Sequence, residues 1–111
     1  MAQLFTLGDF AQTMTTTEPH ERLLSVLREA RAFLSRSGND FAWSKWDDAA
    51  DALREFDGLI SRVERGDIPG RFELDILFAP TGAIQEVSLS SGWGDEFCDL
   101  AARFDEVIKR L

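Results

Sequence analysis

The residue types that most often carry out chemistry are scarce in this chain: His20 is its one histidine and Cys98 its one cysteine. A metal site needs several His, Cys or clustered carboxylate ligands, and a lone histidine does not supply them. A nucleophilic cysteine needs an activating base, and the sequence places no His or Lys beside Cys98. We therefore expect a surface histidine, a cysteine buried as a small hydrophobic residue, no metal and no cofactor.

Carboxylates are abundant, and three of them have helical spacing. Asp47, Asp51 and Glu55 lie four residues apart, so on a helix they share one face. A glycosidase needs two carboxylates that face each other across a cleft, and this spacing does not predict one. We expect no catalytic residues and no enzymatic activity. The acidic edge is interpreted as a solvated helix face, or as a docking strip for a basic protein.

A loop with two glycines, Ser90–Asp95, lies between an expected strand and an expected helix, which is a usual setting for anion binding. It lacks the spacing of both nucleotide-binding glycine motifs, so we expect no phosphate site. Trp93 in this loop is either a plug in the core or an exposed anchor for a partner. Trp43 is the second candidate anchor, because tryptophan is enriched at interaction hot spots.

Two amphipathic helices are expected to precede that loop. The first begins near Thr17 as its N-cap, and Gly38 ends it as the residue after the C-cap. The second begins at Ser44, with Asp47 as its capping-box partner, and Gly66 ends it. Because a short linker joins them, the two helices should pack antiparallel.

The segment that follows has the alternation of a β-hairpin. Phe72–Phe78 predicts one strand, with Phe72 and Ile76 on the buried face, and Ala83–Leu89 predicts the other. Ala79–Gly82 predicts the turn, with Gly82 left-handed. The second strand keeps its apolar residues inside only if Gln85-Glu86 forms a bulge, or if a two-residue turn shifts the register.

The expected fold class is therefore α+β. A closing helix runs from about Asp95 to the end and packs with the helical hairpin and the two-stranded β-hairpin around one core, in a single domain spanning 1–111. The alternative adds Leu4–Leu7 as a third strand. Apolar residues near the N-terminus are expected to cover part of the core.

Composition limits the partners. Among 111 residues, 20 acidic and 12 basic side chains give a net charge of −8, which disfavours direct binding to nucleic acid and to anionic membranes. One cysteine allows no internal disulfide, and the sequence shows no signal peptide and no apolar run long enough for a membrane span. We expect a cytoplasmic protein whose partner is another protein, and a basic one is compatible with its charge.

In size, acidity and general build the chain resembles immunity proteins and antitoxins, although no motif carries the resemblance. Such proteins block basic toxins, so the resemblance implies a non-enzymatic, protein-binding role. The alternative is a homo-oligomeric structural or accessory protein, a homodimer for example, that buries a helix face or an open hairpin edge against a copy of itself.

Overall fold

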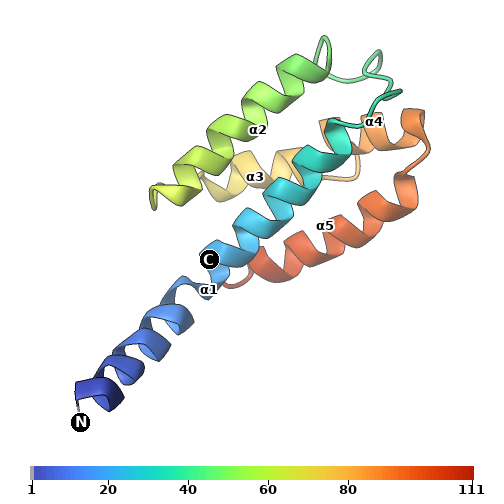
Figure 1. The fold of residues 1–111 in the computed structure, drawn as a ribbon. Coiled ribbons are helices and arrows are strands. Elements are labelled where there is room, and N and C mark those ends of the chain that lie inside the picture. The colour runs from blue at the N-terminus through green and yellow to red at the C-terminus, as the bar shows by residue number, and fades with distance from the viewer. Residues whose placement is uncertain (1) are drawn as a thin grey trace.

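Every regular element in the part of the chain that the structure, a computed structural model, describes is an α-helix (Figure 1). Residues 2–111 are described, with side chains from residue 18 onward. The elements are α1 (Ala2–Leu34), α2 (Ala49–Glu64), α3 (Arg71–Phe78), α4 (Ala83–Ser91) and α5 (Gly94–Ile108). Within these residues no helix is long and apolar enough to cross a membrane.

Helix α1 packs against α2, α4 and α5. Helices α2 and α5 both run antiparallel to it, on either side, and the expected antiparallel pairing of the first two helices is confirmed (Figure 1). An ion pair bridges each of these two helix interfaces. Arg28 of α1 bonds Glu64 of α2 at 2.8 Å, and Arg103 of α5 bonds Glu29 of α1 at 2.7 Å. The short helices α3 and α4 pack against α5 at the remaining side of the core.

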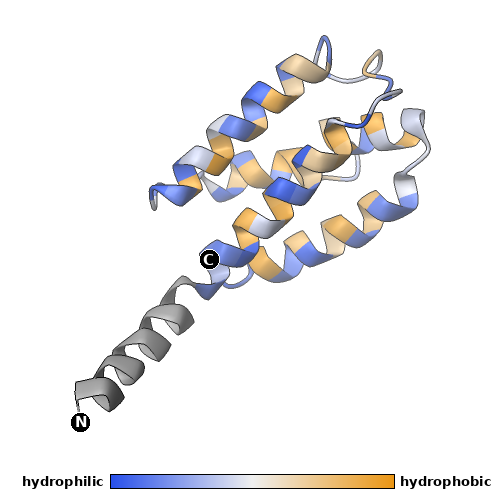
Figure 2. Ribbon diagram, in the orientation of Figure 1, coloured by the Kyte–Doolittle hydropathy of each residue, from blue (hydrophilic) through white to orange (hydrophobic). Residues whose placement is uncertain are grey.

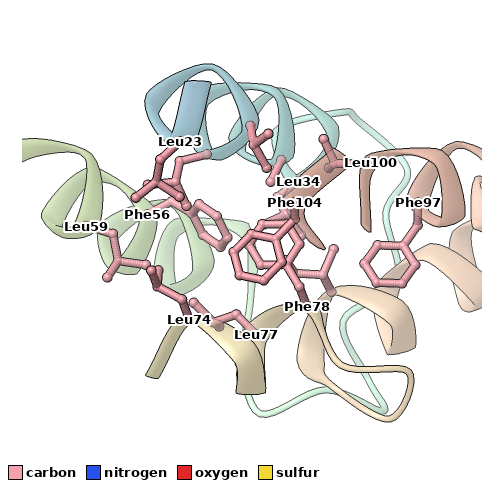
Figure 3. Close-up of a cluster of buried hydrophobic side chains, with 14 of the residues drawn as sticks. Leu23, Leu34, Phe56, Leu59, Leu74, Leu77, Phe78, Phe97, Leu100 and Phe104 are labelled. Carbon is pink, nitrogen blue, oxygen red and sulfur yellow. The ribbon is translucent and has the colours of Figure 1, made fainter. Parts of the chain in front are cut away.

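One apolar core joins these helices, and their hydrophobic faces turn toward it (Figure 2). Leu23, Phe56, Leu74 and Phe104, from four different helices, are at most 1% exposed (Figure 3). The rings of Phe78 and Phe104 stack with centroids 4.1 Å apart. Large buried side chains of this kind contribute roughly 1.5–3 kcal/mol each, so this cluster supplies the main stabilisation of the fold.

The predicted β-hairpin is wrong, and with it the α+β fold class: Arg71–Phe78 and Ala83–Ser91 are both helices. The buried residues of α3 are Leu74, Leu77 and Phe78, which follow the 3.6-residue period of a helix rather than the alternation of a strand. Phe72 and Ile76, expected inside, are 78% and 48% exposed. With helices there is no strand register, and the bulge that we predicted at Gln85-Glu86 does not exist.

The turn at Ala79–Gly82 is present, but it joins two helices. The Gly82 amide donates to the Ala79 carbonyl at 2.8 Å, and Gly82 has a φ of −82°, so it is not left-handed as predicted. A glycine is nevertheless required at position 82, for a steric reason. A Cβ atom there would collide with the main-chain carbonyl oxygen of Ile76, so close approach of α3 to the start of α4 excludes a side chain.

The N-cap of α2 lies four residues later than predicted. Asp48, not Ser44, is the N-cap: its carboxylate accepts from the Asp51 amide at 2.9 Å. Asp51 in turn accepts from the Asp47 amide at 3.1 Å, which gives a reciprocal capping arrangement. The predicted stop at Gly66 is confirmed, with a left-handed φ of +83°.

Two predictions concern α1. The helix spans Ala2–Leu34, so it begins well before the predicted start at Thr17. Leu4–Leu7, the alternative third strand, is helical as well, and both predictions are wrong. The predicted N-cap side chain and the apolar N-terminal side chains lie outside the described residues. At the other end Gly38 is left-handed, with φ +86°, but it follows the last helical residue by four positions instead of ending the helix directly.

Candidate functional site

Trp43 stands at the tip of a tight turn in the linker between α1 and α2. The Ser44 amide donates to the Phe41 carbonyl at 3.0 Å, and the Ser44 hydroxyl donates to the same carbonyl at 2.9 Å. Asp40 accepts from the Ala42 amide at 2.9 Å. This bonding fixes the backbone on both sides of Trp43, whose side chain is 76% exposed.

The linker that carries this turn is attached to the body of the protein at both ends. On one side, Asn39 donates to the Phe33 carbonyl at 2.8 Å, and the Asp40 amide donates to Ser91 at the end of α4 at 2.9 Å. On the other side, Trp46 is buried and packs edge-on against Phe56 of α2. Trp43 is therefore presented from a segment whose position is determined by the core.

Trp93, the other candidate anchor, lies in the core and is 2% exposed. Its ring stacks on Phe33 with centroids 4.9 Å apart, and the Arg36 guanidinium covers the Phe33 ring at 4.4 Å. The Trp93 indole N–H donates to the Asn39 side-chain oxygen at 2.9 Å. The sequence allowed either a plug in the core or an exposed anchor, and the structure places Trp93 in the core.

The carboxylates expected to form an acidic strip do not share one free face. Asp47 precedes α2 and is exposed, whereas Asp51 lies in the first turn of α2, accepts from the Asp47 amide and bonds Arg54 at 3.3 Å. Glu55 accepts from the Trp46 indole at 3.1 Å and from Lys45 at 3.0 Å. Asp51 and Glu55 therefore hold the linker to α2, and their charges are engaged inside the molecule.

An apolar ridge does reach solvent, and we define it as Trp43, Phe72 and Ile76. Phe72 and Ile76 lie one turn apart on the outer side of α3, and Trp43 and Ile76 line a common hollow. All three are large apolar side chains in exposed positions. Sequence reasoning missed Phe72 and Ile76 because it assigned them to a strand. The helical period of Leu74, Leu77 and Phe78 is the signal that leaves both off the core face.

The hollow beside Trp43 has a volume of about 270 Å³ and lies between the linker and the α3–α4 turn. It is lined by Trp43, Ser44, Lys45, Ile76, Leu77, Thr81, Gly82, Ala83 and Glu86. We refer to it as the Trp43 hollow. It combines an aromatic ring, aliphatic side chains and the carboxylate of Glu86, which no basic side chain of the described structure approaches within 4 Å.

Residues with catalytic potential are not brought together in the described part of the chain. Cys98 lies on α5 and is exposed, so the prediction that it is buried is wrong. His20 is half-buried in α1. No group of three or more His, Cys, Asp or Glu among the described residues has the geometry to hold a metal ion.

Comparisons of this chain with protein-family models, with curated proteins and with solved structures find no match. The candidate site therefore rests on its own geometry: an exposed tryptophan on a fixed turn, an apolar ridge and an adjoining hollow.

Proposed function

We propose that this chain is a non-enzymatic protein-binding domain that binds a basic protein through the apolar ridge of Trp43, Phe72 and Ile76. The observation that carries the proposal is the exposure of these three large side chains around one region of the surface. Exposed tryptophan and phenylalanine side chains supply much of the affinity at protein interfaces once a partner removes them from water.

The ridge residues lie outside the core. They are absent from the buried cluster, which Leu74, Leu77 and Phe78 complete from the other side of α3. The fixed turn at Trp43 also favours binding, because an anchor that is already ordered loses little conformational entropy when a partner arrives. Both features support an interaction surface.

The charge of the molecule favours a basic partner. Every basic side chain except Arg65 and Arg110 lies within 3.9 Å of a carboxylate in the described structure. With a net charge of −8, the excess carboxylates dominate the surface potential. A cationic partner would be steered toward such a surface and would associate faster at low salt. A basic protein toxin is one partner of this kind.

The test uses the chain as an immobilised bait in extract of its native host. The ridge variant combines Trp43→Ala with Phe72→Ala. The matched control combines Leu89→Ala with Leu111→Ala, which removes two exposed apolar side chains outside the ridge. We expect a basic protein to be retained by the wild-type and control baits, and its affinity for the ridge variant to fall by about tenfold or more.

Equal retention by the ridge variant would contradict the proposal, provided that its circular dichroism and thermal transition show a folded protein. A protein captured through the ridge should also elute as salt is raised, because electrostatic steering is screened. If retention depends on the ridge but not on salt, the ridge is the binding surface and the proposal that the partner is basic is wrong.

A further inference from the structure

The indole nitrogen of Trp43 differs from those of the other two tryptophans. The indoles of Trp46 and Trp93 each donate a hydrogen bond within the protein, to Glu55 and Asn39 respectively. None of the side-chain hydrogen bonds in the described structure uses Trp43. Its ring is thus exposed and held by no bond of its own, and one side of it borders the Trp43 hollow.

Glu86 supplies the carboxylate of that hollow. It lies in the first turn of α4, where its amide donates to the Gly82 carbonyl at 3.1 Å and fixes the backbone. No Lys or Arg of the described residues forms an ion pair with it. The one cation that lines the hollow, Lys45, is engaged elsewhere: its ammonium group bonds Glu55 at 3.0 Å and lies 5.5 Å from the Trp46 ring.

The remaining wall is aliphatic. Ile76 and Leu77 of α3 and Ala83 of α4 line it, together with Gly82, whose missing side chain lets the start of α4 approach the α3 backbone closely. A side chain that fits must therefore offer an apolar stem and a cationic head. The head must also lie flat against an aromatic ring while it reaches a carboxylate.

We propose that the Trp43 hollow binds an arginine side chain of the basic partner, an inference that rests on the proposed protein-binding function. The guanidinium group is planar and weakly hydrated, so it stacks on a tryptophan face and keeps its N–H donors free at the edge. Those donors suit the Glu86 carboxylate. The protein already contains a contact of this type, since Arg36 covers the Phe33 ring at 4.4 Å.

The prediction can be tested without knowing the partner, with N-acetyl-arginine amide as the probe. Three indole N–H signals are expected in a ¹H–¹⁵N spectrum, one for each tryptophan. We expect the probe, titrated into the whole chain, to shift the Trp43 signal in a saturable manner. The signals of Trp46 and Trp93 should stay in place because their N–H groups are bonded inside the protein.

Two comparisons isolate the chemistry. N-acetyl-citrulline amide has nearly the shape of the arginine probe but no charge, and it should bind about three- to tenfold more weakly. Glu86→Gln should weaken arginine binding by a similar factor. Asp105→Asn is the matched control, since it removes one exposed charge on α5 outside the hollow, and it should leave the titration unchanged.

The absence of any Trp43 shift at probe concentrations that saturate weak sites would overturn the inference. So would equal binding of arginine and citrulline, or an unchanged titration in Glu86→Gln. The proposed function fails differently, namely when the ridge variant still captures its partner from host extract. If that capture depends on the ridge while arginine causes no shift, the partner binds by the ridge and the hollow is not an arginine site.

Discussion

Gly58 is an exposed glycine in the middle of α2. A glycine inside a helix can mean that another backbone approaches it or that the helix bends there. In the structure a Cβ atom at this position would meet nothing within 4 Å. Since a glycine costs a helix interior about 1 kcal/mol relative to alanine, we expect Gly58→Ala to raise the free energy of unfolding by about that amount. Chemical denaturation measures it, through a higher midpoint at an unchanged slope.

The matched change for that experiment is Gly82→Ala, which should lower the free energy of unfolding because its Cβ atom would strike the carbonyl oxygen of Ile76. If Gly58→Ala is neutral or destabilising, some feature of the α2 surface, such as a partner seated on it, requires the glycine.

The three tryptophans show what the sequence determines for a single residue. Trp46 is buried against Phe56, although it precedes α2 instead of lying in it. Whether Trp93 is buried could not be read locally, because its partner Asn39 lies 54 positions away in the chain. The exposure of Trp43 likewise depends on how the linker is pinned to α4. Burial of a loop aromatic is set by contacts between distant segments, which no spacing rule records.

At the scale of elements, the long helices were predictable and the short ones were not. Helices α2 and α5 each carry apolar residues through several turns, so their period is unambiguous. Helix α3 has only eight residues, and Leu74 and Phe78 satisfy both a strand and a helix. The need for a bulge at Gln85-Glu86 was the sign of the wrong period, because Ile84, Val87 and Ser88 fit a helix without any correction.

The ion pair between Glu29 of α1 and Arg103 of α5 predicts that the stability of the protein depends on pH. Glu29 receives two hydrogen bonds from Arg103, both 2.7 Å long, and these bonds lower the pKa of Glu29 below its usual value of 4.5, with burial opposing them. A carboxyl group whose pKa is lower in the folded state stabilises the protein above its unfolded pKa and loses this effect as the pH falls through the folded value. We therefore expect Glu29→Gln to be less stable than wild type at pH 7.

The expected difference is at most about 1 kcal/mol, because the pair is partly exposed and solvent screens it. It should shrink steadily as the pH falls below 4.5 and vanish in strong acid. Unfolding by urea at a series of pH values measures it. Glu106→Gln breaks only a local pair with Lys109, the C-cap of α5, so it serves as the control and should show little difference at any pH. A Glu29→Gln deficit that persists in acid would point to packing, not charge.

At the scale of the whole molecule, the composition predicts the net charge but not where on the surface a partner binds. The excess of acidic over basic residues could be counted directly, and the structure adds that most of the cations are consumed in internal pairs. The apolar ridge could not be predicted from the composition, because it forms only when α3 turns Phe72 and Ile76 outward beside Trp43. Its location therefore depends on α3, an element that the sequence assigned to the wrong class.

Net charge also separates the two functions that compete for the ridge. Two copies of a chain with charge −8 repel each other, so self-association should be weakest at low salt, where the Debye length is about 30 Å at 0.01 M, and stronger at about 0.5 M. Binding of a basic protein has the opposite salt dependence. We expect light scattering to give the mass of one chain at low salt. A dimer at low salt that Trp43→Ala with Phe72→Ala dissociates would mean that a second copy covers the ridge, and the homo-oligomer would replace the basic partner.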